Sequence, residues 1–176
     1  PESYHQLLKA FDCPILKMRY ESAELAKIAI NCCLVSMVST ANTLSEICEG
    51  VGGDWAEIIP ALKLDRRIGK YSYLLPGLGI SGGNLERDLA TIRGIGVKLG
   101  AHVDVVDSWI SSSTYSKDWA YRKLERYLFS EQDEAKVTVL GLAYKANTHS
   151  IKNSPALTLL ESLKGQSVSV FDPIVD

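Results

Sequence analysis

The spacing of hydrophobic residues changes in the last quarter of the chain. Before it, apolar positions recur every three or four residues, a period typical of helices that bury one face. After it, two short apolar runs at 137–141 and 167–171 flank a helical segment that opens with Ser154 and Pro155 and closes at Gly165. The pattern predicts a mainly α region followed by a strand–loop–helix–strand unit, the beginning of an α/β Rossmann-like domain.

The α region is expected to contain helices over 22–50, from Asp54 to about Pro60, over 85–98 and over 104–129. Ser22 is the expected N-cap of the first helix. Asp54 and Glu57 have the spacing of a capping box at the start of the second, and Pro60 limits its length. Ahead of these helices, the apolar stretch 13–16 is compatible with a terminal strand.

The first of these helices carries an uncharged run of 18 residues, from Ile28 to Ser45, which is close to membrane-spanning length. Seven of the 18 are Asn, Ser or Thr, and Glu24 and Lys27 lie just upstream. This polar content favours a helix that other protein covers on most sides over one that crosses a membrane. We therefore expect no membrane span.

Composition and charge exclude some classes of function. Hydrophobic residues make up 46% of the chain and charged residues 23%, as in ordinary globular proteins, and the formal net charge of −2 gives no reason to expect a nucleic-acid partner. The four cysteines lack the spacing of a metal site, so no metal is expected. No secretory signal opens the sequence, and we expect a cytoplasmic protein.

Three separated motifs carry the candidate chemistry. The first, Ala-Glu-Leu-Ala-Lys-Ile-Ala-Ile-Asn at 23–31, lies in the long predicted helix. The second, within 64–88, ends in Pro-Gly-Leu-Gly-Ile-Ser-Gly-Gly-Asn-Leu-Glu-Arg-Asp, and the third is Leu-Gly-Leu-Ala-Tyr-Lys at 140–145 with Ser-Pro-Ala at 154–156. In this order they resemble the signatures of the nucleotide-sugar dehydrogenases, the UDP-glucose/GDP-mannose dehydrogenase family.

The resemblance implies a protein of three parts: a Rossmann domain for NAD, a central helical domain that dimerises, and a C-terminal Rossmann-like domain for the nucleotide sugar. On that plan, residues 1–21 are the end of the NAD-binding domain and a linker, 22–131 the central dimerisation domain, and 132–176 the incomplete start of the C-terminal domain. No Gly-x-Gly-x-x-Gly fingerprint occurs in the sequence, so NAD is expected to be bound mainly outside this chain. Two strands do not make a stable open sheet, and we expect the chain to be a fragment.

Lys27 and Asn31 are four residues apart and therefore share one face of a helix. The resemblance implies that both serve the C6 oxygen of the sugar, and that Asp88 pairs with Lys27 and holds the catalytic water. From spacing alone the alternatives stay open: a surface lysine, an asparagine bonded to a neighbouring helix, and a first-turn aspartate that accepts from free helix N–H groups.

The family's covalent nucleophile is a cysteine, and Asn84 stands at its position. A carboxamide donates and accepts hydrogen bonds but is not a nucleophile. Further departures from the family pattern surround it: Ser81 replaces a glycine, Gly83 a serine, Glu86 a proline and Arg87 a lysine. The resemblance then leaves two outcomes, an oxidation that proceeds without a thioester and nucleotide-sugar binding without turnover.

Further residues match ligand contacts of the family. Those for the nucleotide sugar are Arg67, which is donated across the dimer, Gly77, Gly79, Gly82, Gly83, Tyr144 and Lys145. Lys152 stands where an arginine near the cofactor is usual, so this contact is expected to be weaker. The simpler alternatives are a loop arginine in a surface salt bridge for Arg67 and a turn-rich linker for the glycines.

The implied function is that of an NAD-dependent nucleotide-sugar dehydrogenase, a homodimeric oxidoreductase that oxidises the C6 alcohol of a UDP- or GDP-sugar for polysaccharide biosynthesis, here altered in its second oxidation. One alternative is a non-catalytic nucleotide-sugar-binding or oligomerisation protein, which Asn84 supports. Another is a hydroxyacid or sugar-acid dehydrogenase with a helical second domain. Lys27 and Asn31 fit that class, whereas the 64–88 run fits it poorly.

Overall fold

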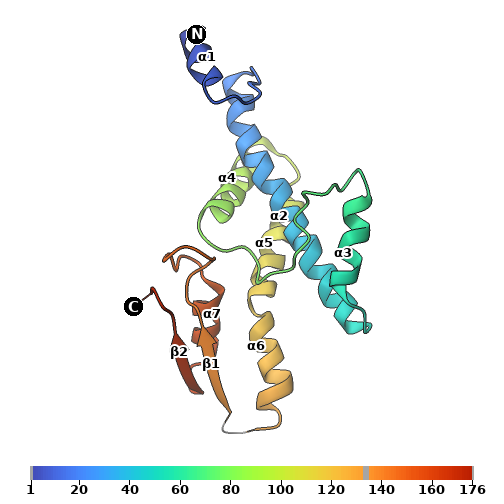
Figure 1. Cartoon of the computed structure of the whole chain (residues 1–176), viewed down its shortest axis with the longest axis vertical. Helices are drawn as coiled ribbons and strands as arrows, with labels where there is room; N and C mark the ends of the chain where they lie inside the picture. Colours follow the sequence, from blue (N-terminus) through green and yellow to red (C-terminus); the bar gives the residue numbers. More distant parts are fainter. Residues whose placement is uncertain (1, 133–134, 176) are drawn as a thin grey trace.

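The structure, a computed structural model, describes residues 2–132 and 135–175. Its centre is the 31-residue helix α2 (Tyr20–Gly50), against which α3 (Trp55–Leu64), α4 (Asn84–Leu99) and α5 (Asp104–Lys117) pack (Figure 1). Two buried clusters join these helices, one of Val35, Ile80, Leu89 and Val106 and one of Ala41, Cys48 and Trp55. The first cluster fixes α4 and α5 on α2, and the second fixes α3.

Strands β1 (Lys136–Leu140) and β2 (Ser167–Phe171) form a parallel two-stranded sheet, in which Lys136 pairs with Ser167 and Leu140 with Phe171. Helix α7 (Pro155–Ser162) connects them and packs against α5 and α6 (Trp119–Leu124), so the sheet unit lies beside the lower end of the helical part in Figure 1. The predicted fold class is confirmed: a mainly α domain is followed by the beginning of a Rossmann-like domain.

Two predicted boundaries of helices were wrong. Helix α2 begins at Tyr20 with Arg19 as its N-cap, so Ser22 lies inside it and caps nothing. Helix α3 continues past Pro60 to Leu64, because Ile59 and Leu62 pack on the cluster around Trp55 and stabilise the turn that the proline weakens. Asp54 is the N-cap of α3 as predicted, and its carboxylate accepts the N–H of Ala56 at 2.8 Å.

Two other expectations also differ from the structure. The stretch 13–16 forms no strand, and a helix, α1 (Glu2–Lys9), which buries none of its residues, lies ahead of it. The helix expected over 104–129 is divided: α5 ends at Lys117, α6 begins at Trp119, and a π-helical turn, η1 (Glu125–Phe129), follows. The division falls at Asp118, whose backbone ψ of −1° departs from helical values.

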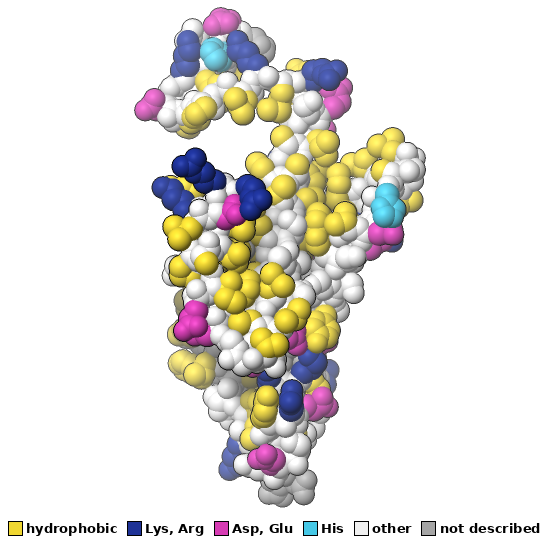
Figure 2. All heavy atoms as spheres, turned by 90° about the vertical axis from the view of Figure 1, so that its right-hand side faces the viewer, with side chains coloured by type: hydrophobic (Ala, Val, Ile, Leu, Met, Phe, Trp, Pro, Cys, Tyr) yellow, Lys and Arg dark blue, Asp and Glu magenta, His cyan; other side chains and the backbone are white. Residues whose placement is uncertain are grey.

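Much of the hydrophobic surface of α2 is not covered by the rest of the chain. Within the described residues, α2 is the one helix long and apolar enough to cross a membrane by length and composition, and most of its apolar stretch is not buried by the rest of the chain. Figure 2 shows hydrophobic side chains gathered on one face of the molecule. Exposed hydrophobic residues of α2, α3 and the segment after α3 include Leu44, Ile47, Ile58, Leu64, Tyr71 and Tyr73. The sequence predicts that other protein covers most sides of this helix. The described part of this chain does not supply that cover.

Asp172 fixes the end of the sheet at which ligands bind in α/β folds. Its carboxylate accepts the backbone N–H groups of Leu142 at 2.6 Å and of Ile174 and Val175 at 2.8 Å. These hydrogen bonds to the charged form lower the pKa of Asp172 from 3.8 to about 2. The loop after β1 is thereby tied to the end of β2.

We expect Asp172→Asn to lower the stability of the protein in urea at about pH 6, because a carboxamide cannot accept all three N–H groups. The folded-state pKa lies below the unfolded value, so the contribution of the carboxylate is present above 3.8 and is lost as the pH falls through about 2. The difference between wild type and variant should shrink over that range. Glu161→Gln on the exposed side of α7 is the control, and a constant difference for Asp172→Asn would contradict the assignment.

Candidate functional site

The candidate site is built around the carboxylate of Asp88, which is 5% exposed near the start of α4. It accepts hydrogen bonds from Lys27 Nζ, from Asn31 Nδ2 at 2.6 Å and from Arg87 Nη2 at 3.3 Å. Lys27 and Asn31 lie one turn apart on α2, so the helical repeat brings both to the same carboxylate. These four residues are called the Asp88 cluster below.

The charge of Asp88 is stabilised by its partners. The hydrogen bond from Lys27 is the largest effect and lowers the pKa of Asp88, burial opposes it, and Asn31 and Arg87 lower the pKa further. The carboxylate therefore stays ionised and holds the Lys27 ammonium in place. Because the Lys27 side chain is 57% exposed, its ammonium can donate to a ligand while it remains anchored.

The glycine loop, defined here as residues 76–84, leads into α4 and ends at Asn84. Its middle lies against α5, where Ser113 Oγ accepts the N–H of Ile80 at 2.7 Å. Gly79 has a φ of +69°, and a Cβ at this position would lie 2.3 Å from the carbonyl oxygen of Ser113. The close approach of loop and helix therefore requires glycine at position 79.

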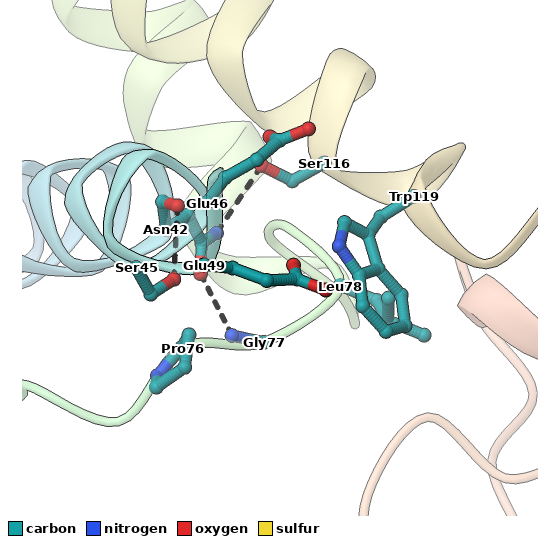
Figure 3. Close-up of a pocket in the computed structure, with 9 residues that line it drawn as sticks. All are labelled: Asn42, Ser45, Glu46, Glu49, Pro76, Gly77, Leu78, Ser116 and Trp119. Carbon is teal, nitrogen blue, oxygen red and sulfur yellow. Dashed lines mark hydrogen bonds between the residues drawn. The ribbon is translucent and has the colours of Figure 1, made fainter. Parts of the chain in front are cut away.

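The start of the glycine loop is held by Asn42, a buried residue of α2 (Figure 3). Its Oδ1 accepts the N–H of Gly77 at 2.7 Å, and its Nδ2 donates to Ser116 Oγ at 3.3 Å. Beside these bonds lies a cavity of about 400 Å³ that Trp119 helps to line. Asn42 is eleven residues beyond Asn31, roughly 16 Å along the helix, so the cavity is separate from the Asp88 cluster.

The end of the glycine loop rests on the segment that follows β1. Gly82 donates its N–H to the carbonyl of Lys152 at 3.1 Å, and Asn153 Nδ2 donates to the carbonyl of Gly82 at 2.6 Å. The Tyr144 ring lies 3.0 Å, and the Lys152 side chain 2.7 Å, from where a Cβ would stand on Gly82 and Gly83 respectively. Gly82, whose φ is +80°, therefore allows the Tyr144 ring to approach the loop, whereas the contact at Gly83 is with the flexible end of Lys152.

Two parts of the chain match domains of a single family. Residues 21–114 match the central domain of the UDP-glucose/GDP-mannose dehydrogenase family, and residues 138–176 match its UDP-binding domain. The chain belongs to this family.

Several relatives are UDP-glucose dehydrogenases. UDP-glucose 6-dehydrogenase TuaD of Bacillus subtilis is 31% identical over 171 residues, which are 96% of this chain and 37% of that protein. The UDP-glucose 6-dehydrogenase of Drosophila melanogaster is 30% identical over 167 residues, 92% of this chain and 35% of that protein. A UDP-glucose dehydrogenase structure from the archaeon Pyrobaculum islandicum has a TM-score of 0.88 at 31% identity, covering 99% of this chain and 41% of that one. The chain thus spans little more than a third of these curated relatives.

In this member of the UDP-glucose/GDP-mannose dehydrogenase family, the predicted site residues fall into separate groups. The Asp88 cluster contains three of them. Asn84, the first residue of α4, is exposed, and its side chain forms no hydrogen bond within the described part of the chain. Arg67 lies elsewhere: its side chain is 90% exposed after α3 and pairs with Asp65 at 2.6 Å, so the chain by itself does not bring it to Lys27.

The remaining predicted contacts follow β1. Tyr144 is half-buried against the glycine loop, and the exposed Lys145 places its ammonium 5.5 Å from the centre of the Tyr144 ring. The Lys152 side chain lies beside Gly83, the residue before α4. The segment after β1 therefore faces the end of the glycine loop rather than Lys27 and Asn31 directly.

The residues that hold the glycine loop were not foreseen from the sequence. Asn42, Ser113 and Asn153 each bind the loop through a side chain, and Glu86, in the first turn of α4, accepts from Asn153. Asn42 offered a signal, because a polar residue inside an uncharged helix must find a partner when it is buried. The other three stand in ordinary polar positions, and their contacts depend on tertiary structure alone.

We expect Lys27→Met to raise the pKa of Asp88, because the variant removes the largest effect that lowers it and leaves the burial that raises it. A ¹³C NMR titration of the Asp88 carboxyl group measures this shift. Arg87→Met should raise the pKa less, since its hydrogen bonds are long at 3.3 and 3.4 Å. Lys63→Met, on the exposed side of α3, is the control. An unchanged Asp88 pKa in Lys27→Met would show that the two groups are not paired in solution.

Proposed function

We propose that this chain supplies the sugar-binding centre and the start of the nucleotide-binding unit of an NAD-dependent dehydrogenase that oxidises the C6 alcohol of a UDP- or GDP-sugar. The Asp88 cluster carries the proposal, because an ammonium and a carboxamide from α2 meet a buried carboxylate from α4. Burying a charge costs desolvation energy, and here the buried carboxylate anchors an ammonium whose side chain is 57% exposed and can reach a ligand. The UDP-glucose dehydrogenases among the relatives favour a UDP-sugar.

Each residue of the cluster has a proposed role. The Lys27 ammonium donates to the C6 oxygen and stabilises the negative charge that develops there as the hydroxyl proton passes to water and the hydride leaves C6. Asn31 donates to Asp88, and its carbonyl oxygen is left to accept from a sugar hydroxyl. Asp88 stays charged and holds Lys27 in place.

The chain offers little to the cofactor. The turn after β1, Gly141-Leu142-Ala143, lacks the glycine pattern that binds a pyrophosphate. We therefore propose that NAD is held mainly by residues outside this chain. In the proposed reaction, NAD accepts the hydride from C6. Lys152 is the one cofactor contact that we propose here. Its ammonium suits an anionic phosphate.

At position 84 the chain has no nucleophile to form a thioester. Cys32 does not replace it: the thiol packs against the buried cluster around Leu89, and burial first, then the charges of Cys33 and Asp88, raise its pKa. We therefore propose that oxidation ends at the aldehyde, or that water adds to the aldehyde and the resulting hydrate is oxidised without a covalent intermediate.

The exposed hydrophobic face of α2 and α3 supports a homodimer. A second copy would cover that face and would bring its Arg67 to the sugar site, which this chain alone does not complete. Within each copy we propose a dimerisation domain over 22–131 and a nucleotide-sugar domain that starts at 132. We also propose cytoplasmic polysaccharide biosynthesis as the setting. A purely monomeric sedimentation profile at micromolar concentration would contradict the dimer.

A second candidate function is nucleotide-sugar binding without turnover. The exposed carboxamide of Asn84 at the nucleophile position favours it. The Asp88 cluster fits both candidates, because it would bind the sugar whether or not a hydride is transferred.

The test uses the natural protein that contains this sequence, with NAD and a panel of UDP- and GDP-sugars. NADH formation and product mass are measured. One NADH per sugar with an aldehyde product means that oxidation stops early, and two with an acid product mean that the hydrate is oxidised. Binding without NADH favours the second candidate, and the absence of binding to any of these sugars would contradict both.

Asn84→Cys is expected to restore the covalent route, because a thiol at the first position of α4 benefits from the positive end of the helix dipole. We expect this variant to give two NADH per sugar and a covalent adduct detectable by mass. Asn84→Ser has a similar side-chain size without the thiol and should behave like the wild type. The absence of a covalent adduct in Asn84→Cys, or an equal adduct in both variants, would contradict the assignment of position 84.

A further inference from the structure

Glu86 joins three parts of the structure at the end of the glycine loop. One carboxylate oxygen accepts from Lys117 Nζ at 2.8 Å, and the other accepts from Asn153 Nδ2. Lys117 is the last residue of α5, and its side chain is 18% exposed. Asn153 also donates to the carbonyl of Gly82 at 2.6 Å, so one carboxamide bridges the glycine loop and the first turn of α4. The side chains of Glu86, Lys117 and Asn153 are called the latch below.

The second half of the glycine loop depends on this region for its position. Within the described residues, this half of the loop has no strand partner. It is bonded to the C-terminal unit in three places: Gly82 donates to the carbonyl of Lys152, Asn153 donates to the carbonyl of Gly82, and Ser81 Oγ donates to the carbonyl of Tyr144 at 3.3 Å. Residue 84 follows directly. Where Asn84 stands relative to Lys27 is therefore set partly by the segment after β1.

The same segment carries the proposed nucleotide contacts. Tyr144 and Lys145 precede Asn153 by eight or nine residues, and the N–H of Tyr144 donates to the carbonyl of Ser150 at 3.0 Å, which closes the segment on itself. A phosphate bound at Lys145 would thus restrain the backbone that holds Asn153. Because Asn153 donates to the carbonyl of Gly82 and to the carboxylate of Glu86, a restrained Asn153 would also restrain the end of the loop and the start of α4.

We propose that the latch couples binding of the nucleotide to binding of the sugar, with Asn153 as the positioning residue; this rests on the proposed function. Nucleotide binding orders the segment after β1, and Asn153 then holds the end of the glycine loop and α4 so that the sugar fits between Asn84 and Lys27. The coupling depends on the carboxylate of Glu86, which accepts from Asn153.

The test compares the affinities of UDP and UDP-glucose, measured by calorimetry on the natural protein that contains this sequence. Asn153→Gly removes the carboxamide and still accepts the left-handed backbone, whose φ is +51°. Asn147→Gly is the matched control, because Asn147 lies in the same segment, is exposed and has a φ of +58°.

For Asn153→Gly we expect UDP affinity within about twofold of the wild type and an approximately tenfold loss of the preference for UDP-glucose, the effect of losing one to two hydrogen bonds. Asn147→Gly should leave both affinities unchanged. Glu86→Gln keeps an acceptor for Asn153 and should retain more of the preference than Glu86→Ala. Thermal unfolding of every variant verifies that it is folded.

The outcomes separate the latch from the proposed function. An intact preference for UDP-glucose in Asn153→Gly overturns the latch and leaves the proposed function standing. Equal weakening of UDP and UDP-glucose, or equal effects of the two glycine variants, shows a structural role only and also overturns it. A wild type that binds UDP-glucose no more tightly than UDP contradicts a UDP-sugar site and the latch with it.

Discussion

The buried carboxylate of Asp88 holds the two longest helices of the helical domain in register. A charge removed from water must be paired and hydrogen-bonded, and Lys27 and Asn31 meet that need because one helical turn separates them. Asp88 is one turn beyond Asn84, so the same pairing also fixes where the glycine loop ends. The electrostatics of the site and the geometry of its loop thus follow from one contact between α2 and α4.

The backbone of the glycine loop does not pair with a strand. Side chains from different elements form its hydrogen bonds instead: Asn42 of α2 at the start, Ser113 of α5 in the middle and Asn153 at the end. A loop held in this way is not defined by its local sequence. Its shape depends on both domains at once, which places the candidate site at their junction.

The features that could be predicted from the sequence were those with a periodic or local pattern of residues. Helix α2, helix α4 and both strands were recoverable because burial of one face repeats along the chain. Lys27 and Asn31 were visible as a pair, and family resemblance alone indicated that Asp88 pairs with Lys27. The bond from Asn31 to Asp88, 57 residues further along the chain, was not indicated. Helix α3 continues past Pro60 because tertiary packing stabilises it, and no local signal reports that packing. The role of Asn153 requires a left-handed backbone that spacing does not reveal.

The contacts of the Asp88 cluster do not involve the side chain at position 84. Under the proposed function, stabilisation of charge at C6 would rest on Lys27 and Asp88, whereas covalent capture would need a nucleophile at position 84, so the two tasks would be separable. Around position 84 the structure is held by other residues: Asn153 donates to the carbonyl of Gly82 at 2.6 Å and to the carboxylate of Glu86. The end of the loop is therefore positioned by contacts that do not depend on the side chain at position 84.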